Sequence, residues 1–160
     1  MSFDDWALAL HVLSAFALVA GVAFFWVLIV MGRRIDTAGE TLRLGPPNRI
    51  AEACVGAGAG GTILFGVWLA FSVGGYNIWD GWIIAALVLW VIAMALGSRT
   101  SAAFSPAVDK ARALDTAGQG TTPNAELLAL NRTSQGVLLQ ALTSLVVLLV
   151  LLDMIFKPGA

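Results

Sequence analysis

The chain has 160 residues, of which 59% are hydrophobic and 12% are charged, and its formal net charge is -1. The charged share is about half that of an average soluble domain, and the dispersed basic residues exclude a nucleic-acid-binding surface. The apolar residues form blocks too long for the core elements of a soluble domain, so the composition favours an integral membrane protein.

Four apolar blocks follow one another along the chain, at residues 6–31, 53–73, 78–96 and 137–156. Each meets or nearly meets the roughly 20 residues that a helix needs to cross about 30 Å of hydrocarbon. The sequence therefore predicts an all-α fold, a four-transmembrane-helix bundle that forms one membrane domain over residues 1–160. The first block is too long for a signal peptide and lacks a basic start, so we expect it to be retained.

Basic residues separate the two ends of the predicted helices. All lysines and arginines except Lys157 lie between spans one and two or between spans three and four. Because positive residues stay on the cytoplasmic side, we expect residues 32–50 and 98–130 to be cytoplasmic loops. The N-terminus and the C-terminus then lie outside, in a bacterial inner membrane. A short amphipathic helix is expected within the second loop, near residues 105–114.

An internal repeat relates the two halves of the chain. Residues 7–13 (ALALHVL) align with 86–92 (ALVLWVI), and 35–40 (IDTAGE) align with 114–119 (LDTAGQ). After an insertion, residues 48–52 (NRIAE) align with 131–135 (NRTSQ). Three matches in the same order predict two parallel-repeat helical hairpins, at residues 3–75 and 78–158. The repeat places His11 opposite Trp90.

His11 is the single histidine of the chain and lies inside the first span. The small residues Ala17 and Gly21 later in this span favour helix packing, and ionisable residues within spans normally face the bundle. Three interpretations stay open for His11: a neutral imidazole that hydrogen-bonds to another helix, a ligand of haem b or copper, and a proton-handling group. Met154 is the methionine predicted at the same depth, so it is the candidate second cofactor-binding residue.

The second and fourth spans carry packing signals of their own. Gly56 and Gly60 form a small-xxx-small pair, which lets another helix or a flat cofactor approach the backbone closely. The G-x-G-x-x-G pattern in the same stretch lacks the strand that a dinucleotide site requires, so that interpretation is rejected. In the fourth span, Gln140, Thr143 and Ser144 are expected to hydrogen-bond between helices.

A polar cluster is expected at the cytoplasmic mouths of spans two and four. Its members are Asn48, Arg49 and Glu52 with their repeat equivalents Asn131, Arg132 and Gln135. The spacing of Arg49 and Glu52 allows an ion pair. The cluster serves either for helix capping and interfacial anchoring or as a polar vestibule for a ligand or partner.

The stretch "WALALHVL" followed by "AGVAFF" resembles the first span of an uncharacterised family of bacterial predicted integral membrane proteins. More distantly, it is similar to the opening helix of copper-resistance D-type membrane proteins and of the membrane haem-type protoporphyrinogen oxidase. In the oxidase family the histidine of this motif binds haem, which implies the same role for His11. This chain has no lysine within any span, whereas a lysine is important in that family, and this argues against an enzyme.

Three functions follow from these features. The first is a non-enzymatic membrane module that self-associates or serves as a subunit of a larger membrane complex. The second is a haem- or metal-binding membrane protein that uses His11 as ligand, and the third is a small dimeric transporter. The expected partners are the lipid bilayer, a second copy of the chain and other membrane subunits.

Overall fold

A computed structural model describes residues 2–72 and 78–157, and the regular structure of these residues is entirely helical. The helices are α1 (Phe3–Gly32), α2 (Ala38–Arg43), α3 (Gly45–Ser72), α4 (Gly81–Thr116), α5 (Ala125–Asn131) and α6 (Ser134–Phe156). Four helical segments are long and apolar enough to cross a membrane: Phe3–Gly32, Ala38–Ser72, Gly81–Thr116 and Ala125–Phe156. The prediction of an all-α chain with four such helices is therefore confirmed.

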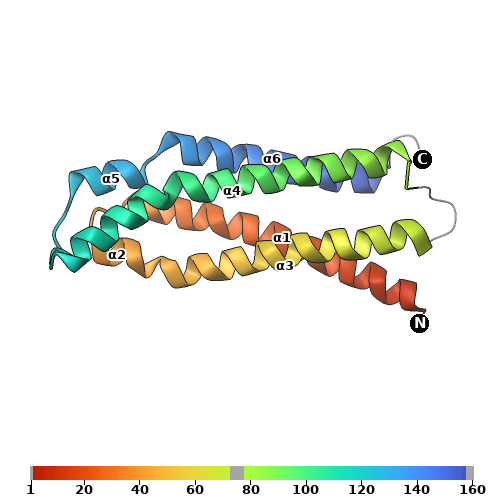
Figure 1. Cartoon of the computed structure of the whole chain (residues 1–160), viewed down its shortest axis with the longest axis horizontal. Helices are drawn as coiled ribbons and strands as arrows, with labels where there is room; N and C mark the ends of the chain where they lie inside the picture. Colours follow the sequence, from red (N-terminus) through yellow and green to blue (C-terminus); the bar gives the residue numbers. More distant parts are fainter. Residues whose placement is uncertain (1, 73–77, 158–160) are drawn as a thin grey trace.

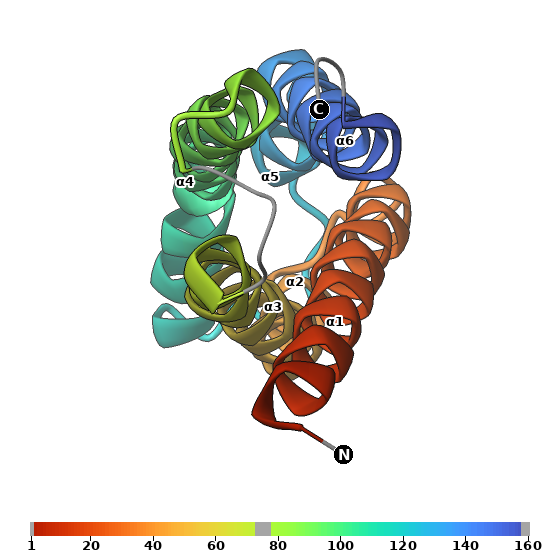
Figure 2. The same ribbon diagram turned by 90° about the vertical axis from the view of Figure 1, so that its right-hand side faces the viewer.

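The long helices form two packed pairs (Figure 1). α1 packs against α3, and we call these helices the first pair; α4 packs against α6, and these form the second pair. Both termini lie at one end of the bundle, which we call the terminal end, and α2 and α5 lie at the other, the loop end. Figure 2, seen from the terminal end, shows the second pair lying above the first.

Glycines allow the backbones of the first pair to approach closely. A Cβ atom on Gly21 of α1 would lie 2.7 Å from Val55 Cγ2, and one on Gly58 of α3 would lie 2.7 Å from Leu18 Cα. Gly56 and Gly60 point elsewhere, because both are exposed and a Cβ on either would meet nothing within 4 Å. Within the chain, Gly58 makes the close contact between helices that the sequence predicted for Gly56 and Gly60.

Polar bonds and a small apolar core join the two pairs in the middle of the bundle. The buried Gln140 amide donates to the Val22 carbonyl at 3.1 Å, and Trp26 Nε1 donates to Ser144 Oγ at 2.9 Å. The expectation of helix-to-helix bonds thus holds for Gln140 and Ser144, whereas Thr143 donates to a carbonyl of its own helix. The core beside them draws on all four long helices and includes Leu18, Val22, Ala59, Ala93 and Val147.

The loop end is more helical than the sequence indicated. α4 has 36 residues and is therefore about 54 Å long at about 1.5 Å per residue, well beyond the roughly 30 Å of hydrocarbon. The predicted loop 98–130 is thus largely the second half of α4 together with α5, and the separate helix at 105–114 is a continuous part of α4. Likewise, the predicted loop 32–50 contains α2 and the start of α3.

The second half of α4 packs against α2 and α5 around the buried side chains Ala38, Ala107, Ala111 and Leu127. A backbone bond joins the start of α2 to the segment after α4, because the Gly39 N–H donates to the Gly120 carbonyl at 2.8 Å. Lys110 on α4 also pairs with Glu126 on α5. These contacts make the loop end a small packed unit in its own right.

Candidate functional site

A cavity of about 790 Å³ lies between the two helix pairs in the terminal half of the bundle. All four long helices contribute to its walls, which are mainly aliphatic and aromatic. Toward the middle of the bundle the cavity ends at the apolar core described above, since Leu18, Ala93 and Val147 belong to the cavity lining and to that core. In the other direction the cavity extends to the terminal end of the bundle, where Asp4, Asp5 and Lys157 belong to its lining. The size lies within the range of about 300–1,000 Å³ that small-molecule and cofactor sites occupy.

His11 lies in the wall of this cavity, and its orientation is set by α3. The Nδ1 atom of the ring lies 3.0 Å from the backbone carbonyl oxygen of Thr62. A carbonyl only accepts hydrogen bonds, so Nδ1 must carry the proton and donate. In the neutral ring, Nε2 then holds a lone pair. None of the hydrogen bonds among residues 2–72 and 78–157 uses Nε2.

Gly66 makes room for the His11 ring one helical turn beyond Thr62. A Cβ atom at position 66 would lie 2.9 Å from Cε1 and 3.2 Å from Nδ1 of the ring. Only a residue without a side chain lets the imidazole lie this close to the α3 backbone. Thr62 therefore fixes the ring through its backbone carbonyl, and Gly66 leaves the space that the ring occupies.

The two residues that the sequence linked to His11 both line the same cavity. Trp90, its predicted repeat equivalent, contributes from α4, and Met154, the predicted second ligand, contributes from α6. Trp90 Nε1 is buried and has no hydrogen-bond partner among the described residues. An imidazole, an indole and a thioether thus line one mainly apolar cavity, from three different helices.

The lining of the cavity is mainly apolar and holds one histidine, His11. Among the described residues, no group of three or more histidine, cysteine, aspartate or glutamate side chains could hold a metal ion. A copper ion at His11 and Met154 would therefore need water or a partner chain to complete its coordination. A haem iron needs only axial ligands from the protein, and one free imidazole nitrogen meets that requirement.

The polar residues expected at the loop end separate into two groups. Asn48 donates to Glu52 at 2.8 Å, in place of the Arg49–Glu52 ion pair that the spacing suggested. Asn131 donates to the Ile35 carbonyl at 3.1 Å, and Arg132 donates to the Arg33 carbonyl at 3.0 Å. Asn131 and Arg132 therefore fasten the segment after α1, and no hydrogen bond among the described residues links them to Asn48. Arg49 and Gln135 are exposed.

Sequence reasoning missed Thr62 and Gly66. Thr62 is a polar residue inside an otherwise apolar span, and Gly66 follows one helical turn later. That pairing is a usable signal, because residues four apart share one face of a helix. It indicates a face of α3 that has a polar group and lets another helix approach closely. It does not identify His11, which is 51 residues away from Thr62 in the chain.

Comparisons of the chain with protein-family models, with curated proteins and with solved structures find no match. The resemblances of the first span therefore stay predictions.

Proposed function

We propose that this chain is a non-enzymatic membrane protein that binds one apolar cofactor, haem b, in the cavity between its helix pairs. The observation that carries the proposal is the His11 ring, whose Nδ1–H donates to the Thr62 carbonyl. The same bond fixes the tautomer in which Nε2 is the basic nitrogen. A metal-binding histidine commonly donates its other ring N–H to such an acceptor, which orients the ring and raises its basicity.

The surroundings of His11 support a large apolar occupant. The cavity is lined by aliphatic side chains from all four long helices and by the aromatic ring of Trp90. Because His11 is the single histidine, ligation by two histidines of one chain is excluded. His11 would hold the iron alone, together with Met154, or together with His11 of a second copy. When bound, the haem supplies one-electron redox chemistry or the binding of a small ligand at an open axial position.

A haem titration of the purified protein in detergent tests the proposal. We expect wild-type protein to give a saturable Soret band, and His11→Gln to lose it while eluting unchanged from a size-exclusion column. An amide is a poor iron ligand but keeps a donor and an acceptor, so the bundle stays folded. Cys54→Ser is the matched control, because the free thiol on α3 is another haem-ligating group outside the cavity. A His11→Gln spectrum identical to wild type, or a band lost in Cys54→Ser, contradicts the proposal.

Self-association is a second candidate property, and the exposed glycines of α3 favour it. Gly56 and Gly60 have open space where a side chain would stand, on a face that the described residues of the chain do not cover. Small residues at this spacing let a second helix pack closely. We expect Gly60→Ile to reduce the mass measured by light scattering in detergent to that of a single chain. A wild-type protein that is already a single chain would contradict this.

We also infer that the loop end is cytoplasmic, that both termini lie outside the bacterial inner membrane, and that the helix pairs are parallel repeats. The distribution of lysine and arginine supports the orientation. The three ordered sequence matches support the repeat, and the packing of α1 with α3 and of α4 with α6 agrees with the two expected hairpins. In a Cys54→Ser background, Thr121→Cys should stay unlabelled by an impermeant maleimide in intact cells. Ser2→Cys in the same background should be labelled. The reverse pattern would contradict the orientation.

A further inference from the structure

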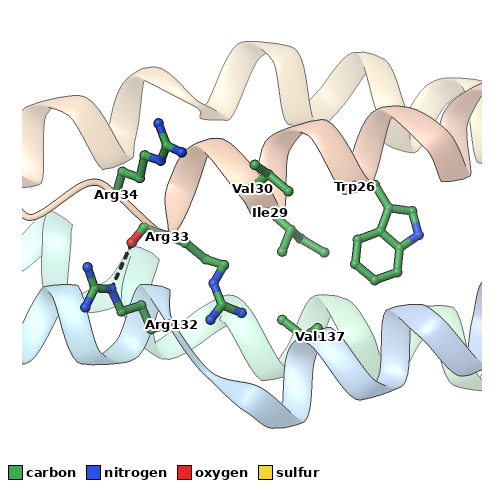
Figure 3. A pocket seen from close by; sticks show the side chains of 7 residues that line it. All are labelled: Trp26, Ile29, Val30, Arg33, Arg34, Arg132 and Val137. Carbon is green, nitrogen blue, oxygen red and sulfur yellow. Dashed lines mark hydrogen bonds between the residues drawn. The ribbon is translucent and has the colours of Figure 1, made fainter.

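A second, smaller pocket of about 500 Å³ lies at the loop end, open to the surface and apart from the His11 site. Three arginines line it, Arg33 and Arg34 at the end of α1 and Arg132 just before α6 (Figure 3). Its other wall is apolar and includes Trp26 and Val137. The pocket therefore has arginine side chains on one side and apolar side chains, its apolar flank, on the other. It lies where the apolar run of α1 ends.

Hydrogen bonds hold both sides of this arginine pocket in place. Arg132 Nε donates to the backbone carbonyl of Arg33 at 3.0 Å, as the dashed line in Figure 3 shows. This bond uses Nε and leaves the two terminal nitrogens of the guanidinium for a ligand. On the apolar side, Trp26 is fixed by its hydrogen bond to Ser144 on α6. The pocket is thus built by residues from both helix pairs.

The positive charge of the pocket is uncompensated within the described part of the chain. The ion pairs of residues 2–72 and 78–157 are Lys110–Glu126 and Arg112–Asp109, and neither involves an arginine of the pocket. α6 begins at Ser134, between the lining residues Arg132 and Val137, and its N-cap residue Thr133 provides no side-chain cap. The positive end of this long helix dipole adds to the attraction of an anion.

We propose that the arginine pocket binds the headgroup phosphate of an anionic phospholipid of the bilayer. Guanidinium groups bind phosphate oxygens in a bidentate manner, and basic pockets between membrane helices bind anionic lipid headgroups. The apolar flank formed by Trp26, Ile29 and Val30 on α1 provides a surface for the acyl chains. This lipid site is independent of the haem proposal.

Thermal unfolding of the full chain in non-ionic detergent measures the binding of added phosphatidylglycerol, phosphatidylcholine or inorganic phosphate. We expect phosphatidylglycerol to raise the unfolding temperature saturably and the other two additives to have little effect. Arg33→Gln combined with Arg34→Gln should weaken the apparent affinity roughly thirtyfold, at about fivefold for each cationic side chain. This variant keeps the Arg132 hydrogen bond, because its acceptor is the backbone oxygen of residue 33.

Arg43→Gln combined with Arg49→Gln is the matched control, since it removes the same charge at the same end but outside the pocket. The control should bind phosphatidylglycerol like wild type. Equal weakening of both variants, equal stabilisation by phosphatidylcholine, or equal affinity for inorganic phosphate overturns the proposal. Should the pocket variant unfold, native mass spectrometry of wild-type protein in mixed micelles decides: preferential retention of phosphatidylglycerol is expected, and equal retention of both lipids overturns the site.

Discussion

Gly66 sets how closely the His11 imidazole lies against α3. In Gly66→Ala the new methyl group would stand 2.9 Å from Cε1 of the ring, so the ring must move and its bond to the Thr62 carbonyl must distort. We expect haem affinity to fall at least tenfold, about 1.4 kcal/mol, measured by Soret titration, while the bundle stays folded. Gly97→Ala on α4, outside the cavity and where a Cβ meets nothing within 4 Å, should bind haem like wild type. Equal titrations of wild type and Gly66→Ala would contradict this role of Gly66.

Gln140 tests the contribution of a single polar bond between the helix pairs. Its side chain is 2% exposed and donates to the Val22 carbonyl. Hydrogen bonds between membrane helices contribute about 0.6 kcal/mol on average and at most about 1.7 kcal/mol. We expect Gln140→Leu to lower the free energy of unfolding in detergent by an amount within that range. A loss well above about 2 kcal/mol would show that the amide does more than join α6 to α1.

At the scale of helices, the two glycine faces of α3 should respond differently to alanine. Gly58→Ala places a methyl group against the backbone of α1 at Leu18, and such overpacking costs about 1–3 kcal/mol. Gly56→Ala meets open space within one chain. In the single-chain Gly60→Ile background it should be neutral or stabilising by up to about 1 kcal/mol, because alanine favours helix more than glycine does. Unfolding of both variants in detergent measures the difference. Equal stabilities would contradict the packing described for the first pair.

The loop-end unit depends on Leu127 of α5, which is fully buried among residues of α2 and α4. Leu127→Ala should destabilise the protein by about 2–5 kcal/mol, as expected for a cavity left in a packed core. Leu145→Ala is the control, because Leu145 is 51% exposed on the outer face of α6. Its loss of stability should be much smaller. If the two variants unfold alike, the loop end is not the packed unit that the helix contacts indicate.

For the whole molecule, the sequence predicts the four long helices and much less of how they pack. Apolar length alone identifies the spans, since hydrocarbon thickness fixes how many residues a crossing helix needs. The continuation of α4 through Pro106 is absent from that signal, because polar residues interrupt the apolar run there. This part of the helix packs against α2 and α5 through Ala107 and Ala111. Gly56 and Gly60 lie on one face of α3, and Gly58 and Gly61 lie on another, against α1. Both pairs have helical spacing, so periodicity could not select the face that makes the contact.

The candidate site could likewise be predicted only in part, because its single residues are visible in the sequence and its tertiary packing is not. His11 and Met154 are identifiable because each is a ligand-type residue at a matching depth in a span. The cavity itself arises because the helix pairs meet mainly near the middle of the bundle and leave space toward the terminal end. That separation, like the approach of Arg132 to Arg33 across 99 positions of sequence, depends on tertiary packing that no local pattern encodes.

The central claim is that His11 Nε2 binds a cofactor within the four-helix cavity. The most direct measurement is the visible absorption spectrum of wild-type protein purified from cells grown with a haem precursor. Bound haem at up to one per chain, with a Soret band that shifts on reduction, is the predicted result. A colourless protein that also takes up no haem on titration would contradict the claim, and His11 would then be a packing residue that joins α1 to α3.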